Sequence, residues 1–280
     1  MKKLFAITLS VLSFSAFAQA PTGKIVIKKG QHFQVESTSN GDISEEMMGQ
    51  NMAMKMGSVT KMTADVKDFK DNNYTITQKI TNIKSTFNGM GQEKTFDSDK
   101  KEDMDGEAGA IYKDKVNVAK DIVVTNDGKT ITAKDTTSKP ADANPMAAMM
   151  AMMSGGQENA AAALFLVIPA GKKIGGNWQD STISDGLKLV RSYTLNSIAN
   201  KVASVTINSV LDINKTMQLQ GMEMKSVMQS KIASNVLVDL ISNIQKENKT
   251  TMDVTGTVDV MGQSVPISSK IVTVVTIKEI

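Results

Sequence analysis

Residues 201–213 read Lys-Val-Ala-Ser-Val-Thr-Ile-Asn-Ser-Val-Leu-Asp-Ile, and this stretch decides the fold class. Apolar side chains recur in it at two-residue intervals: Ala203, Val205, Ile207, Leu211 and Ile213. A period of two puts these side chains on one face of an extended strand, whereas a helix would scatter them around its axis. The stretch therefore predicts a long β-strand with one apolar face.

The same alternation recurs on both sides of this stretch. The positions that alternate with polar residues include Met62, Ala64, Val66, Tyr74, Ile76, Ile80, Val254, Val258 and Val260. Asn126-Asp127-Gly128-Lys129 separates two Val/Ile-rich runs and is typical of a tight hairpin turn. One apolar and one polar face per strand is typical of antiparallel sheets. We expect a mainly β fold, with long antiparallel strands in a strongly curved sheet or half-barrel.

The middle of the chain interrupts this pattern. Asn144-Pro145 is typical of a helix start, and the Met- and Ala-rich residues 146–153 follow it. A second helix is expected over 158–167, ending before Pro169. We therefore expect an N-terminal β half (21–135), a loop plus Met/Ala-rich helical segment (136–171) packed on the apolar face, and a C-terminal β half (172–280). The two halves are expected to form one continuous domain.

Composition excludes several classes of function. The 280 residues include no Cys and one His, so disulfides, thiolate metal sites, Cys nucleophiles and multi-His zinc sites are excluded. A formal net charge of +3 does not indicate a nucleic-acid partner. The chain lacks a Ser/His/Asp constellation, a phosphate-binding loop and a dinucleotide fingerprint. We expect a protein that is not an enzyme and needs no cofactor.

The first 20 residues have the features of a secretory signal peptide. Lys2 and Lys3 precede an apolar stretch, and Ala18-Gln19-Ala20 offers small residues at a cleavage site. The stretch is short for a membrane span, and no later segment has 18 consecutive apolar residues. We expect an exported protein, periplasmic or extracellular, without a helical membrane span. Because no Cys lies at the cleavage site, a lipoprotein is not expected.

Several stretches of the sequence resemble known proteins. Leu164–Pro169 followed by Ile174–Trp178 resembles a pattern that recurs in exported bacterial β-proteins, in which an apolar helix ends at Pro and a strand opens with Gly-x-x-Trp. Glu45–Met56, with its Met-Gly-Gln core, and Val254–Ile267 resemble a family of uncharacterised exported proteins, a domain of unknown function found in Bacteroidetes-type bacteria. The resemblance implies an all-β fold and an envelope location. It transfers no catalytic residue.

Twenty methionines are the unusual feature of the composition. Met packs irregular cores and also suits deformable apolar binding surfaces, so a lipid or other apolar small molecule is a candidate partner. The residues expected to line such a site are Met52, Met54, Met56, Met149, Met150, Met153, Leu164 and Phe165. Three alternatives stay open: core packing alone, thioether binding of Cu(I) or Ag(I), and a small outer-membrane β-barrel.

Overall fold

The computed structural model describes most of the 280-residue chain. The described residues are 20–47, 50–89, 91–106, 108–131, 164–184, 186–219, 222–260 and 263–280. Residues 1–19, which hold nearly all of the predicted signal peptide, lie outside them. So do the expected helix over 146–153 and most of the expected helix over 158–167.

The described residues are mainly β-strand. Two short helical pieces, α1 (Lys101–Asp105) and η1 (Gly109–Ile111), follow the fourth strand. The strands are β1 (His32–Met47), β2 (Gln50–Lys70), β3 (Asn73–Gly89), β4 (Gln92–Asp97), β5 (Ala119–Thr125), β6 (Thr130–Ile131), β7 (Asn177–Ser184), β8 (Leu187–Ala199), β9 (Val202–Leu219), β10 (Met222–Asp239), β11 (Gln245–Val260) and β12 (Gln263–Glu279). At 3.3–3.4 Å per residue, a strand of 16 residues extends for about 50 Å.

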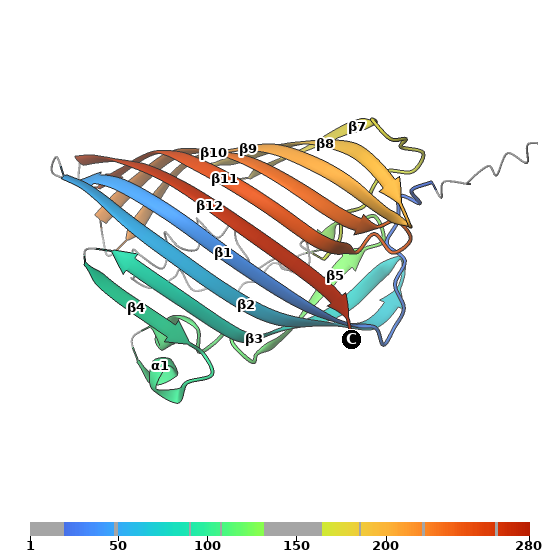
Figure 1. Cartoon of the computed structure of the whole chain (residues 1–280), viewed down its shortest axis with the longest axis horizontal. Helices are drawn as coiled ribbons and strands as arrows, with labels where there is room; N and C mark the ends of the chain where they lie inside the picture. The colour runs from blue at the N-terminus through green and yellow to red at the C-terminus, as the bar shows by residue number, and fades with distance from the viewer. Residues whose placement is uncertain are drawn as a thin grey trace, which may run out of the picture.

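All the strands belong to one antiparallel sheet. Its order is β6-β5-β3-β2-β1-β12-β11-β10-β9-β8-β7, and β4 pairs with β3 off this path. The pairing of β1 with β12 joins the first half of the chain to the second. Among the described residues, β6 and β7 stand at opposite ends and do not pair, so the sheet is not closed. Figure 1 shows the long strands running obliquely as the sheet curls, with α1 beside β4. The expectation of a mainly β fold with a large antiparallel sheet is confirmed.

Tight turns connect neighbouring strands where the chain offers residues that tolerate a left-handed backbone. Asp71 and Asn72 have φ of 53° and 62° between β2 and β3, and Gly128 has φ of 89° between β5 and β6. Positive φ at both Asp71 and Asn72 suits a two-residue hairpin, whereas a single left-handed residue such as Gly128 suits a longer hairpin loop. The hairpin predicted at Asn126-Asp127-Gly128-Lys129 is confirmed, and Thr125 N–H donates to the Lys129 carbonyl at 2.8 Å.

Alternation divides the sheet into an inner and an outer face, and two packed cores lie on the inner face at one end. A third, smaller cluster of Ile83, Phe96 and Val116 lies beside β3, β4 and α1. The core on the first half comprises Ile25, Ile27, Phe33, Val35, Met62, Ala64, Val66, Tyr74, Ile76, Val124, Leu164, Phe165 and Ile277. The core on the second half comprises Ile168, Tyr193, Leu195, Ala203, Val205, Val236, Val238 and Leu240. Segments 20–31 and 164–170 contribute to these cores, so they cover this end of the inner face.

The end of the second expected helix is wrong. Phe165 forms an antiparallel bridge with Ile244. Leu166 N–H donates to the Asn243 carbonyl at 3.0 Å, and Gln245 N–H donates to the Leu164 carbonyl at 2.9 Å. Residues 164–167 are not helical because their backbone groups bond to the β10–β11 connection, and a central helical segment is not supported.

Candidate functional site

The outer face of the sheet is polar and charged along its length. On the central strands β1, β11 and β12 its exposed residues include Gln34, Asp42, Lys249, Asp253, Lys270 and Lys278. These side chains alternate with the inner-face residues, so they can stay hydrated while the inner face packs. The outer face is therefore mainly polar, although it also exposes Val210, Val227 and Val272.

A row of hydroxyl side chains crosses the inner face. In the strand register, Ser85 lies beside Ser58, Ser58 beside Ser39, and Ser39 beside Thr273. The row continues through Thr250 to Ser234. We call these six residues the hydroxyl row; it spans β3, β2, β1, β12, β11 and β10. At about 4.8 Å per strand, the row is about 24 Å long.

Hydrogen bonds connect two pairs within the hydroxyl row. Ser39 Oγ lies 2.7 Å from Thr273 Oγ1, and Ser234 Oγ lies 2.7 Å from Thr250 Oγ1. Thr250 also donates to Asn248 Oδ1 at 3.0 Å, so Ser234 is the donor in its pair. The Ser39–Thr273 pair shares a single hydrogen bond, which leaves one of its two O–H groups for another acceptor.

Beyond the hydroxyl row, away from the packed cores, the inner face becomes apolar again. Ile43, Met54, Val254 and Ile267 are between 3% and 8% exposed. Ile43 lies beside Met54 on β2, so these side chains belong to one continuous patch of the face. We call this part the apolar half of the inner face. It is the candidate binding surface.

Ser269 places a polar group inside the apolar half. It lies beside Ile43 of β1 and Val254 of β11 and is 7% exposed. Its buried hydroxyl oxygen has no hydrogen-bond partner. An unsatisfied buried hydroxyl costs about 1–3 kcal/mol.

The structure places four of the predicted site residues. Met54 is buried in the apolar half, and Met56 is half-buried one row closer to the hydroxyl row. Leu164 and Phe165 are buried in the packed core of the first half instead, which separates them from Met54. Only the backbone of Met52 is described, on the same register face as Met54. Met149, Met150 and Met153 lie outside the described residues, so their role stays a prediction.

We call the end of the inner face that carries the two packed cores the closed end. The connection between β10 and β11 stabilises it. Asp239 Oδ1 accepts hydrogen bonds from Ile241 N–H at 3.1 Å, and from Ser242 N–H and Oγ at 2.9 and 3.0 Å. Burial by itself would raise the pKa of Asp239, but these hydrogen bonds outweigh it and lower the pKa below its usual value. The ionised carboxylate thus fixes this turn.

A polar and aromatic cluster lies on the edge hairpin β7–β8. Trp178 stacks on Tyr193 with ring centroids 5.0 Å apart. Asp180 accepts hydrogen bonds from Arg191 Nε at 2.6 Å and Tyr193 Oη at 2.8 Å. Burial, and then the hydrogen bond to Asp180, raise the pKa of Tyr193. These contacts are satisfied within the hairpin, so the cluster is structural.

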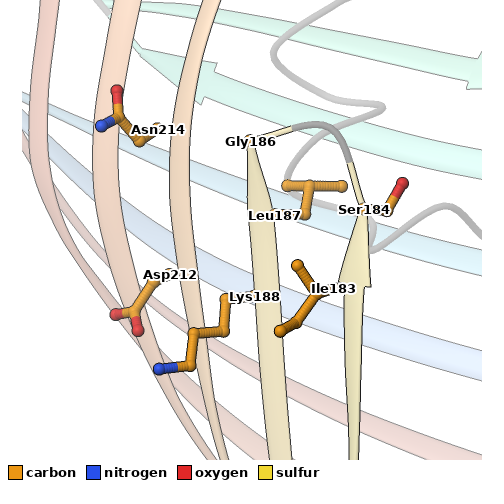
Figure 2. Close-up of a pocket in the computed structure, with 7 residues that line it drawn as sticks. All are labelled: Ile183, Ser184, Gly186, Leu187, Lys188, Asp212 and Asn214. Carbon is orange, nitrogen blue, oxygen red and sulfur yellow. The ribbon is translucent and has the colours of Figure 1, made fainter.

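A shallow hollow lies at the far end of the same hairpin. Figure 2 shows Ile183 and Leu187 beside it, with Lys188, Asp212 and Asn214 around them. Ile183 is 77% exposed there, so the hollow is an open surface depression. It offers no buried polar group and does not belong to the apolar half of the inner face.

The geometry provides no metal centre among the described residues. No group of three or more His, Asp or Glu side chains is placed to hold an ion there. The cross-strand neighbours of Met54 are Ile43 and Gly89, so no second thioether lies directly beside it. In the described part of the chain, no helix has the length and apolar character to cross a membrane.

The chain matches a known protein family over most of its sheet. The model described as "Family of unknown function (DUF6263)" matches residues 71–245, more than half of the sequence. The chain belongs to this family. The DUF6263 match begins in the turn between β2 and β3 and ends at the first residue of β11. The expectation of a family of unknown function is confirmed, although Glu45–Met56 and Val254–Ile267, on which the predicted resemblance rested, lie outside the matched residues.

Solved structures similar to this DUF6263 chain are outer-membrane proteins of low identity. An outer membrane channel of Pseudomonas putida F1 is 9% identical, with 92% of this chain and 99% of that chain covered and a TM-score of 0.25. OccK7 (OpdD) of Pseudomonas aeruginosa is 5% identical, with 91% and 100% covered and a TM-score of 0.24. The translocator domain of the autotransporter NalP from Neisseria meningitidis is 7% identical, with 89% of both chains covered and a TM-score of 0.20. No curated protein matches the chain.

The hydroxyl row and Ser269 were not predicted from the sequence. The signal was present, because Thr250 and Thr273 interrupt strands whose inner positions are otherwise mostly apolar. Counting outward from the β11–β12 hairpin would have placed these two residues opposite each other. The pairing of Thr273 with Ser39 could not be counted in this way, since it joins residues 234 positions apart.

Proposed function

We propose that the protein is an exported, non-catalytic envelope protein that binds a lipid or other apolar ligand on the apolar half of its inner face. The observation that carries the proposal is the contrast between the two faces of the same strands. On β12, Ile267 is buried on the inner face while Ser268 and Lys270 are exposed on the outer face. A protein that holds an apolar ligand in water needs this arrangement, with hydrocarbon contacts inside and charge outside.

Charged side chains on the outer face also favour a ligand-binding protein over a sheet that is inserted in a membrane. A strand sheet that faces lipid needs a continuous apolar band about 25 Å tall on its outer surface. Exposed Lys270, Asp253 and Lys249 lie on the outer face of the central strands β11 and β12. Their charge favours a protein that is surrounded by water.

Methionine suits the proposed ligand because its unbranched side chain adapts to different shapes. Met54 and Met56 occupy successive inner positions of β2, about 7 Å apart along the strand. At this spacing per step, Met52, Met54 and Met56 are too far apart for all three thioethers to bind one ion unless the strand bulges. The spacing thus supports an apolar surface more than a Cu(I) or Ag(I) site.

Native mass spectrometry of the mature protein, purified gently from its own host's envelope, tests the proposal. We expect extra mass that solvent extraction removes and that fragments as lipid. A bare polypeptide mass combined with no uptake of added lipid would overturn the proposal. Stoichiometric uptake of Cu(I) under reducing conditions, without lipid, would favour the thioether alternative instead.

A matched pair of variants locates the site. Met54→Gln puts a polar group in the apolar half, whereas Ala53→Gln alters the neighbouring exposed position on the outer face. We expect lipid retention to fall in Met54→Gln and to stay unchanged in Ala53→Gln, with both variants folded by circular dichroism. Equal retention in the two folded variants would place the ligand elsewhere.

A further inference from the structure

The N-terminal segment has two different sides where it covers the closed end. Ile25 and Ile27 are 2% and 7% exposed and pack in the core of the first half. Lys24, Val26 and Lys28 alternate with them and are exposed, and the exposed fraction of Val26 is 49%. The side of the segment that faces away from the core therefore consists of two lysines with an apolar side chain between them.

The β10–β11 turn places a second exposed apolar side chain beside Val26. Val26 N–H donates to the Ser242 carbonyl at 3.3 Å, and Ile241, the residue before Ser242, is 38% exposed. Leu240 N–H donates to the carbonyl of Lys201 at 2.8 Å, so the β8–β9 turn lies next to the same connection. Lys201 is exposed there. Val26 and Ile241 thus have exposed lysines beside them from two different segments.

A third exposed apolar side chain comes from the end of β2. Phe69 is 47% exposed, and its ring centroid lies 4.4 Å from that of Tyr74. Tyr74 Oη donates to the Ile25 carbonyl at 3.1 Å, which brings the aromatic pair next to the N-terminal segment. Exposed apolar side chains that gather at one site indicate an interaction surface. We call Val26, Ile241 and Phe69 the apolar tips of the closed end.

Unpaired charge around the apolar tips is mainly positive. Three carboxylates at this end have a lysine partner: Asp68 with Lys29 at 3.4 Å, Asp127 with Lys129 at 3.0 Å, and Asp239 with Lys246 at 3.7 Å. Asp71 and the C-terminal carboxylate of Ile280 have no such partner among the described residues. In the same part of the chain, no ion pair engages the ammonium groups of Lys24, Lys28 and Lys201. These three lysines leave the surface complementary to negative charge.

We infer that the closed end binds the surface of an anionic lipid bilayer. The apolar tips enter the interface, and the three unpaired lysines lie next to headgroup phosphates. Binding of this kind gains strength from buried apolar area and from attraction to anionic lipids together. The tips protrude from turns and from an irregular segment, which suits a fluid surface that deforms around them more than a shaped protein partner. The closed end is distinct from the apolar half of the inner face, so this inference goes beyond the proposed function and does not depend on a bound ligand.

Vesicle co-sedimentation of the full mature protein tests the charge requirement. We expect about tenfold or more tighter binding to vesicles that contain phosphatidylglycerol than to vesicles of phosphatidylcholine alone, and weaker binding as salt is added. One lysine near an anionic surface contributes about fivefold in affinity, so the double variant Lys24→Gln/Lys28→Gln should bind about tenfold or more weakly. Lys188→Gln/Lys270→Gln removes the same charge from exposed outer-face positions and should bind like the unmodified protein. No preference for phosphatidylglycerol, or an equal loss in the two folded double variants, would overturn the inference.

A fluorescent label shows which end of the protein meets the bilayer. The chain has no Cys, so one introduced thiol labels a single site. We expect a polarity-sensitive fluorophore on Val26→Cys to shift to the blue when phosphatidylglycerol vesicles are added. The same fluorophore on Ile183→Cys, at a 77% exposed position of the β7–β8 hairpin, should not shift. Vesicle binding without a shift at position 26, or with equal shifts at both positions, would overturn the assignment to the closed end.

Discussion

At the scale of single residues, Asp239 shows how one carboxylate can hold an irregular connection between regular strands. Three donors converge on its Oδ1 atom, two of them backbone N–H groups that follow the end of β10. Lys246 Nζ lies 3.7 Å from Oδ2 and adds a weaker attraction. Because these contacts favour the ionised form, the stability they provide depends on pH.

We expect Asp239→Asn to lower the free energy of unfolding at pH 7 and to have a diminishing effect in acid. The folded-state pKa is lowered, so the contribution of the charge is fully present above the unfolded-state pKa of about 3.9. It is lost as the pH falls through the folded-state pKa. Urea denaturation of both proteins between pH 2.5 and 7 measures the difference. Asp114→Asn, on an exposed turn, is the control. A difference for Asp239→Asn that stayed constant over this range would contradict the role of the charge.

At the scale of elements, Asn243 connects three parts of the chain at the closed end. It is fully buried, with φ of 58°. Its Nδ2 donates to the Lys24 carbonyl at 2.7 Å, and its Oδ1 accepts from Ile168 N–H at 3.2 Å. The side chain thereby ties the N-terminal segment and segment 164–170 to the turn after β10. These two segments are what cover the packed cores.

We expect Asn243→Gly to lower the free energy of unfolding by about 1–3 kcal/mol, since it keeps the left-handed backbone but loses the two hydrogen bonds. Asn243→Ala should cost about 1 kcal/mol more, because alanine is strained at this φ. Asn200→Gly is the matched control, at an exposed turn with φ of 50°, and should change stability by less than about 0.5 kcal/mol. Chemical denaturation measures all three. Equal costs for Asn243→Gly and Asn200→Gly would show that the hydrogen bonds do not stabilise the closed end.

At the scale of the whole molecule, one strand pair makes the two halves a single sheet. The β1–β12 ladder runs from Phe33 beside Glu279 to Glu45 beside Ile267. Phe33, Val35 and Ile277 of this ladder belong to the core of the first half, and the core of the second half lies at the same end of the inner face. Pro266 precedes Ile267, the β12 residue in the last pair of this ladder. Its missing N–H is therefore not needed for pairing with β1.

Because the ladder is long and central, we expect both halves to unfold together. Ile76→Ala, fully buried in the core of the first half, should lower the free energy of unfolding by about 2–5 kcal/mol. Trp178 packs against the core of the second half and is the only Trp of the chain. Its fluorescence should therefore report the same shifted midpoint as circular dichroism. An unshifted fluorescence transition beside a biphasic circular dichroism curve would show independent halves. Ile183→Ala, at a 77% exposed position, should leave the midpoint unchanged.

The amino-acid sequence by itself determined the class of the fold, the position of the tight hairpins and membership of a family of unknown function. Residues 201–213 are one continuous strand pattern, and β9 begins at Val202 with alternate positions buried. Period-two burial and turn residues such as Asn126-Asp127-Gly128 are local properties, so they can be inferred without knowing which strands are neighbours. Export and the domain boundaries at 135 and 171 stay predictions.

Only the tertiary structure decided what the inner face presents. Residues 164–167 are predicted to be helical from the sequence. Their backbone groups instead form hydrogen bonds with the β10–β11 connection, where Phe165 forms a bridge with Ile244. The hydroxyl row likewise exists only because β1 pairs with β12, which brings Ser39 beside Thr273. Pairings between residues so far apart depend on how the whole sheet assembles, and no local pattern encodes their register. The candidate site could therefore be anticipated through Met54 and Met56, but its polar component, Ser269 and the hydroxyl row, required the assembled sheet.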